Sequence, residues 1–305
     1  MHVHDHGSNR RALLVALGLV VGLMAGEIVA GILAHSLALL SDAAHMLTDA
    51  GAIGLSLLAL WLASRPAAGN LTFGLRRAEV LSAQANGGTL LVLAGLIVYA
   101  AVRRLITPLD AGGWTILVVA LVGLAVNALA TAQLARANRG SMAVEGSYQH
   151  VLTDVFAFAG TAVAGVVIIA TGFTRADPIA SLVVATLMVR SAVGLLRDSG
   201  RVLLEAAPAG MDVSLIGHAL VSDPRVTSIH DLHVWEIGTD FPALSAHVLV
   251  HPGDDCHAVR RELEKLLRER FEITHTTLQV EHADPSSARV ELGAAVARRE
   301  PLEHR

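Results

Sequence analysis

Residues 37–62 read LALLSDAAHMLTDAGAIGLSLLALWL, an apolar run of helical length that contains His45 and Asp49. The motif His-x-Leu-Thr-Asp, which begins at His45, recurs at His150 inside a second apolar run at 143–172. Residues four positions apart lie on one face of a helix, about one turn from each other. Each run therefore presents one imidazole and one carboxylate from the same face of an apolar helix.

Two such helices that face each other would direct two nitrogens and two oxygens to one point. We call these four residues the quartet: His45, Asp49, His150 and Asp154. A tetrahedral set of imidazoles and carboxylates suits Zn²⁺ or a closely related ion. Ionisable side chains are costly in hydrocarbon and usually mark an ion or proton path. The motif therefore predicts the transport site of a membrane zinc transporter.

The composition is also that of a membrane protein. Of 305 residues, 53% are hydrophobic and only 16% are charged, and the mean hydropathy is +0.55. A membrane-spanning helix needs about 20 mainly apolar residues. The segments that meet this requirement are 12–34, 37–62, 79–102, 113–135, 143–172 and 178–197. We expect a six-helix, all-α transmembrane domain over 12–200, embedded in the lipid bilayer and preceded by a cytoplasmic segment at 1–11.

Arginine placement predicts the orientation of these spans, because cytoplasmic loops carry an excess of positive charge. With the N-terminus inside, the cytoplasmic flanks hold Arg10, Arg11, Arg65, Arg76, Arg77, Arg136, Arg139, Arg197 and Arg201. The outer flanks hold Arg103, Arg104 and Arg175. We expect a multi-pass protein of the bacterial cytoplasmic (inner) membrane with both termini in the cytoplasm.

Several function classes are disfavoured. The single cysteine, Cys256, excludes an intramolecular disulfide framework. The net charge of −4 argues against a nucleic-acid partner. Catalytic zinc keeps an open coordination position, which a cage of four protein ligands lacks, and the chain has no His-Glu-x-x-His motif. The sequence therefore predicts neither an enzyme nor an organic cofactor.

Beyond about residue 205 the apolar runs shorten and charges increase. We predict helices at 212–222 and 256–270, with strands at 226–237, 243–250 and 274–282. The order αββαβ predicts a small α+β domain over 206–284, with helices on one face of a three-stranded sheet. Residues 285–305 are polar and are expected to form a flexible tail.

Protons are the natural driving force for such a site. A histidine must be neutral to bind zinc, and free histidine titrates near pH 6.5. We therefore hypothesise exchange of Zn²⁺ for H⁺ at the quartet. Asp42, three residues before His45, is either an extra carboxylate on the exit route or a hydrogen-bonding group near the outer helix end. The polar residues of other spans, Glu27, Asn86 and Asn127, are expected to hydrogen-bond between helices.

The chain resembles the cation diffusion facilitator family, in particular its zinc-transporting branch. The resemblance rests on Glu27–Gly31, Ser36–Asp49, Phe73-Gly74-x-x-Arg77-Ala78-Glu79, His150–Asp154, His230–Trp235 and Leu244–Val248. It implies a proton-coupled exporter that forms a homodimer and ends in a ferredoxin- or metallochaperone-like cytoplasmic domain. In this family a quartet of two histidines and two aspartates implies Zn²⁺, with Co²⁺ or Cd²⁺ as further substrates.

The resemblance also implies a second metal site in the cytoplasmic domain. His230, His247 and His282 fall on the three predicted strands, in a shared site at the dimer-facing region, and Asp284 and His257 are further candidate ligands. His233 lies at odd spacing from His230, so on a regular strand it would point to the opposite face. Metal bound here would regulate transport.

Two alternatives remain at the level of sequence. One is a membrane zinc sensor that binds metal without moving it, although such a sensor has no need for a proton-titratable quartet in the membrane. The other is a transporter for a harder cation such as Mn²⁺ or Fe²⁺, for which the two imidazoles are less suitable ligands.

Overall fold

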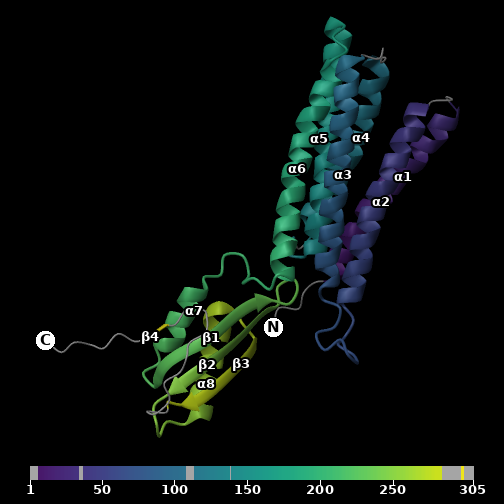
Figure 1. Cartoon of the computed structure of the whole chain (residues 1–305). Coiled ribbons are helices and arrows are strands. Elements are labelled where there is room, and N and C mark those ends of the chain that lie inside the picture. Colours follow the sequence, from purple (N-terminus) through teal and green to yellow (C-terminus); the bar gives the residue numbers. More distant parts are fainter. Residues whose placement is uncertain (1–5, 34–36, 108–112, 138, 284–296, 299–305) are drawn as a thin grey trace. The chain divides into compact units, whose positions relative to one another are not determined.

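The computed structural model describes residues 6–33, 37–107, 113–137, 139–283 and 297–298. The chain divides into two compact units, Met1–Gly200 and Arg201–Arg305 (Figure 1). The first is a bundle of long helices, and the second combines helices with a β-sheet. Each unit is considered separately below.

The helical unit contains six long helices among the described residues. They are α1 His6–Leu33, α2 Leu37–Ala63, α3 Ala78–Ile106, α4 Gly113–Ala135, α5 Met142–Thr171 and α6 Ala176–Leu203. At 1.5 Å per residue these helices are about 35 to 45 Å long, which exceeds the ~30 Å thickness of the hydrocarbon core. Their bounds follow the predicted spans closely, except that α1 begins before the apolar run at 12.

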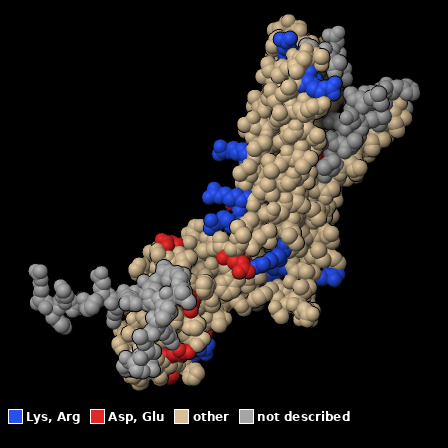
Figure 2. All heavy atoms as spheres, viewed as in Figure 1, with Lys and Arg blue, Asp and Glu red and all other residues tan. Residues whose placement is uncertain are grey.

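Five helices contain a segment that is long and apolar enough to cross a membrane, within the part of the chain that the structure describes. They are α1, α3, α4, α5 and α6, and α2 contributes the shorter apolar segment Asp49–Ala63. The protein is therefore a multi-pass membrane protein with a helical transmembrane domain, and a total of six spans stays a prediction. On the face seen in Figure 2, most of this unit is tan, the colour of residues other than Lys, Arg, Asp and Glu. Basic side chains lie near its ends and along one edge.

The interior of the helical unit is packed from small and aliphatic side chains. One buried cluster joins α1, α2, α4 and α5 and includes Leu13, Ile53 and Leu134. Another joins α3 to α6 through Leu90 and Met188. Large apolar side chains also point outward along the helices, as a surface that faces lipid requires.

The second unit has the predicted order of helices and strands, with one addition. Its elements are α7 Val213–Val221, β1 Val226–Glu236, β2 Pro242–Val250, α8 Cys256–Phe271, β3 His275–His282 and β4 Ala297–Arg298. The sheet order is β3-β2-β1-β4. Strand β2 pairs antiparallel with β1 and parallel with β3. The two-residue strand β4, which pairs with β1, lies in the stretch that was expected to be a flexible tail.

One face of the sheet is covered and the other is open. Alternate residues of β2, among them Leu244, Ala246 and Val248, are buried in a core that also contains Ile216 of α7 and Leu263 of α8. The intervening positions of β2 are only partly buried. The open face therefore presents the side chains that remain accessible for a ligand.

A bulge in β1 changes which residues share this open face. His230 pairs with His247 and His233 pairs with Ser245, with a register shift between the two pairs. Because His247 and Ser245 are two residues apart on β2, their partners His230 and His233 point to the same face. The expectation that His233 points away from His230 was wrong, because it assumed a regular strand.

Candidate metal sites

Three members of the quartet meet inside the helical unit. One ligand atom from each of Asp49, His150 and Asp154 lies within 4.8 Å of the others. Asp49 comes from α2, whereas His150 and Asp154 lie one turn apart on α5. Their exposed fractions are only 5%, 1% and 6%, respectively. Two motifs distant in sequence therefore form one buried group of donors.

A direct contact joins the two helices at this point. Nε2 of His150 lies 2.8 Å from Oδ1 of Asp49. Among the described residues, the buried Nδ1 of His150 has no hydrogen-bond partner. The hydroxyl of Thr153 in the same motif donates to the carbonyl oxygen of Gln149 on its own helix, at 2.7 Å. The histidine and aspartate of the motif are thus directed into the site, while the threonine satisfies its hydroxyl locally.

The fourth member, His45, belongs to α2, but its side chain lies outside the described residues, as does that of Asp42. The three described members already supply one imidazole and two carboxylates. Buried carboxylates in an apolar bundle need a compensating positive charge, either a bound cation or protons. The arrangement can therefore hold a divalent metal ion or exchange it for protons.

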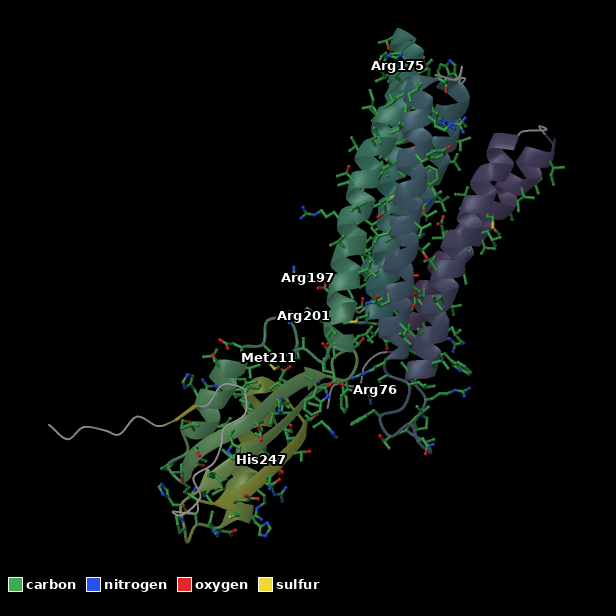
Figure 3. All side chains as sticks on the ribbon, viewed as in Figure 1. Arg76, Arg175, Arg197, Arg201, Met211 and His247 are labelled. Atoms are coloured by element: carbon green, nitrogen blue, oxygen red, sulfur yellow. The ribbon has the colours of Figure 1, made fainter. Side chains whose placement is uncertain are left out.

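A second group of donors lies on the open face of the sheet. Ligand atoms of His230, Asp231 and His247 lie within 4.8 Å of one another, and all three side chains are partly exposed. The rings of His230 and His247 have centroids 5.0 Å apart. We call these three residues the sheet cluster, and Figure 3 labels His247 within it.

Asp231 did not follow from the sequence. Neighbouring residues of a regular strand point to opposite faces, so its position next to His230 argues against a shared site. At the bulge, however, Asp231 has a φ of 51°, in the left-handed region. This local conformation directs its carboxylate toward the histidines. No signal in the sequence alone marks the position of the bulge.

The structure separates His282 from the sheet cluster. His282 pairs in register with Val250, whereas Gln279 is the residue of β3 that pairs with His247. The Nε2 atom of His282 lies 3.5 Å from Sγ of Cys256 and 2.9 Å from the carbonyl oxygen of Asp254. Asp284 lies outside the described residues.

His257 lies at the start of α8, where the side chain of Asp255 caps the helix. Oδ1 of Asp255 accepts hydrogen bonds from the backbone N–H groups of Ala258 and His257, at 3.1 and 2.9 Å. These bonds hold the pKa of Asp255 below its ordinary value. The carboxylate of Asp255 is therefore used in helix capping, and the imidazole of His257 is exposed.

Comparison with known families matches both units. Residues 13–204 match the cation efflux transmembrane domain, and residues 208–283 match the cytoplasmic domain of cation efflux proteins. Together the two matches cover most of the chain, and the boundary between them falls near that between the two compact units.

Individual relatives align along nearly the whole chain. The zinc transporter ZitB of Escherichia coli is 38% identical over 290 residues, with 92% of each chain covered. The cadmium, cobalt and zinc/H(+)-K(+) antiporter of Bacillus velezensis is 36% identical over 289 residues, also with 92% of each chain covered. The metal cation efflux protein CzcD of Cupriavidus metallidurans is 36% identical over 287 residues, covering 92% of this chain and 90% of the relative. A solved structure of the metal-bound C-terminal domain of CzcD matches with 32% identity over 23% of this chain and 99% of that chain, at a TM-score of 0.23.

Proposed function

We propose that this chain, which belongs to the cation diffusion facilitator family of metal cation efflux proteins, exports Zn²⁺ from the cytoplasm in exchange for H⁺. The observation that carries the proposal is the buried group of Asp49, His150 and Asp154, which joins two apolar helices. With His45 it would form a tetrahedral site of two imidazoles and two carboxylates between α2 and α5. The names of the relatives, which include zinc, cobalt and cadmium, support Zn²⁺ as the main substrate, with Co²⁺ and Cd²⁺ as further ones.

The exchange follows from competition for the same donor atoms. Zinc binds neutral imidazole and ionised carboxylate, so its arrival from the cytoplasm expels protons from the quartet. Protons that enter from the outer side neutralise the carboxylates and charge the histidines, and this lowers the affinity of the quartet for zinc. Because the site is buried, metal and protons must reach it through alternate openings of the bundle.

The orientation that export requires is consistent with the arginine distribution. Figure 3 shows Arg175 at one end of the helical unit, with Arg76 and Arg197 toward the opposite end. The end with more arginines is proposed to face the cytoplasm, with both termini on that side of a bacterial inner membrane. The charged C-terminal unit is then the cytoplasmic domain, in agreement with the description of the family domain that it matches.

The sheet cluster is proposed to be a regulatory metal site. His230 and His247 supply nitrogen ligands and Asp231 supplies oxygen, a set that Zn²⁺ accepts. A zinc ion with three ligands from one chain has one position left, and a ligand from a second copy in a homodimer would fill it. Rising cytoplasmic zinc would then bring the two C-terminal units together and favour transport.

Zinc flux in liposomes tests this function. The purified chain is reconstituted, a pH gradient is imposed, and zinc is followed with an entrapped dye. Gradient-dependent flux is expected in the native chain and should be lost in Asp49→Ala and Asp154→Ala. Asn127→Ala is the matched control, because Asn127 is also a buried polar residue of a long helix, and among the described residues its side chain bonds to Gly123 of that same helix. Zinc binding without flux under any gradient would instead support the sensor.

A further inference from the structure

A second buried polar group, distinct from the metal donors, joins three helices of the bundle. We call it the serine–asparagine cluster: Ser56 of α2, Ser82 and Asn86 of α3, and Ser147 of α5. None of the four side chains is more than 3% exposed. Its centre is Ser56, whose Oγ accepts from Nδ2 of Asn86 at 3.3 Å and from Oγ of Ser147 at 2.8 Å. Oγ of Ser82 lies 3.3 Å from the same atom.

The cluster lies between the quartet and one end of the bundle. Ser147 precedes His150 by one helical turn, and Ser56 follows Asp49 by two turns. Both steps lead toward the end where α2 terminates and α5 begins. A metal ion that moves between the quartet and this end must pass the level of the cluster.

The polar path continues beyond the cluster. On α3, Glu79 lies one turn before Ser82 and two turns before Asn86, so the three share one helix face. The carboxylate of Glu79 accepts a hydrogen bond from Oγ of Ser141 at 2.6 Å, and both side chains are buried. Buried polar groups thus follow one another from the quartet to the start of α3 and α5.

These hydrogen bonds differ from those of other buried polar residues in the same bundle. Ser199 of α6 donates to the carbonyl oxygen of Leu195, and Asn127 of α4 donates to that of Gly123, each within its own helix. A hydroxyl or amide in an apolar helix can therefore be satisfied locally. In the serine–asparagine cluster, Oγ of Ser56 also donates to the carbonyl oxygen of Ala52 on its own helix, at 3.2 Å, but the other bonds run between helices. The bond of Asn86 to Ser56 breaks if α3 moves away from α2, and the bond of Ser147 to Ser56 breaks if α5 moves away from α2.

We infer that the serine–asparagine cluster is a gate that closes the route between the quartet and the end of the bundle where α3 and α5 begin. This inference rests on the proposed transport function. Divalent cations pass when the bonds of Ser56 to Asn86 and Ser147 break, and the released hydroxyl and amide oxygens then replace part of the ion's water shell. Glu79 lies on the same route, where its carboxylate attracts the cation.

Access of a thiol reagent to a buried cysteine tests the gate. Ile53 is fully buried and lies on α2 between Asp49 and Ser56, and Cys256 is the only native cysteine. The full chain with Cys256→Ser and Ile53→Cys is reconstituted in liposomes of known orientation. A membrane-impermeant methanethiosulfonate is then applied from each side, and the rate of labelling is measured.

Asn86→Ala and Ser147→Ala each remove one bond between helices. The labelling rate should rise roughly fivefold, since one hydrogen bond changes an equilibrium by a factor of this order, and only from the side where α3 and α5 begin. Gly146→Ala disturbs the bond of Asn86 to Ser56 by crowding, because an added Cβ would lie 3.1 Å from Nδ2 of Asn86 and shift that amide. It should give the same one-sided increase. Asn127→Ala and Ser199→Ala, which remove bonds within one helix, should leave the rate unchanged.

Equal labelling in the parent and in all three cluster variants would overturn the gate. An equal increase from both sides would also overturn it, because this is the result of general loosening. Zinc flux is measured on the same liposomes before modification. If the native chain shows no gradient-dependent flux, the transport function is refuted. If flux is normal but the labelling rate of the cluster variants equals that of the parent, the gate alone is refuted.

Discussion

At the scale of single residues, the contact between Asp49 and His150 joins two helices through groups that are both buried. The 2.8 Å separation between Nε2 and Oδ1 fixes the imidazole relative to α2. Asp154 completes the described part of the site from the next turn of α5. Each side chain is costly in an apolar bundle by itself, and under the proposed function a bound cation or protons balance the charge of the three.

Replacement of Asp154 by Asn keeps the shape of the side chain and removes its charge. We expect the Zn²⁺ affinity of the helical site to fall by roughly a hundredfold, since even the loss of an outer partner of a metal ligand costs ten- to a hundredfold. A competing zinc-chelating dye measures this affinity in a His230→Ala, His247→Ala background. Asp177→Asn is the matched control, because that carboxylate binds Arg104 at 3.0 Å, away from the site. Unchanged affinity in Asp154→Asn would exclude Asp154 as a ligand.

His247→Ala removes a nitrogen donor from the centre of the sheet cluster. Equilibrium dialysis of the full chain should then find one zinc ion fewer per chain, while gradient-driven flux at saturating zinc persists. His218→Ala serves for comparison, because His218 is an exposed histidine of α7 outside the cluster. If the native chain, His247→Ala and His218→Ala bind the same number of zinc ions, the sheet cluster does not bind zinc.

The two sites differ in how far the sequence predicts them. The spacing of His150 and Asp154 is a local property of a helix, so the sequence places both on one face before any tertiary structure is known. The sheet cluster depends on a bulge, and its position is decided by the pairing of β1 with β2. For this reason Asp231 was missed and His233 was assigned to the wrong face.

At the scale of helices and strands, hydropathy predicts the long helices well because the bilayer requires apolar runs of a fixed length. It does not predict the polar first turns of α1 or the two-residue strand β4, which exists only through its pairing with β1. It also leaves open the partners of polar residues within helices. Asn86 bonds to another helix, as expected, whereas Asn127 bonds within its own, because a nearby carbonyl satisfies it equally well. The side chain of Glu27 lies outside the described residues.

An ion pair ahead of β1 makes the second unit sensitive to acid. Asp223 bonds to the guanidinium of Arg225, at 2.7 Å for the shortest contact, and Arg225 also bonds to Glu262 of α8. The side-chain hydrogen bond from Arg225 holds the pKa of Asp223 below its ordinary value of 3.8. A lowered pKa in the folded state stabilises the fold above the unfolded value, and this contribution is lost as the pH falls through the folded value.

Asp223→Asn should therefore lower the urea midpoint of unfolding at pH 7. The further decrease of this midpoint below about pH 4 should be smaller in the variant than in the parent. The effect is expected to be at most about 1 kcal/mol, because solvent screens a partly exposed pair. Fluorescence of Trp235 in β1 reports on this unit once Trp61 and Trp114 are replaced by Phe, with urea as the denaturant. An acid dependence identical to that of the parent would show that the pair contributes nothing.

At the scale of the whole molecule, a membrane bundle with a buried donor group is combined with an α+β unit that carries a second donor group. Both units match domains of cation efflux proteins. The central claim concerns the bundle: metal and protons compete for the same side chains. Flux alone shows that a gradient drives transport, but it does not show where the protons bind.

Counting the protons released when zinc binds tests this claim most directly. The detergent-solubilised chain, with His230→Ala and His247→Ala to remove the sheet cluster, is titrated with Zn²⁺ in weak buffer near pH 6.5 while a pH dye records the released protons. We expect zinc binding to release protons, and both the binding and the release to be lost in Asp49→Asn and Asp154→Asn at zinc concentrations that just saturate the parent. Tight zinc binding without proton release, or release that both variants retain, would contradict the exchange of metal for protons at the quartet.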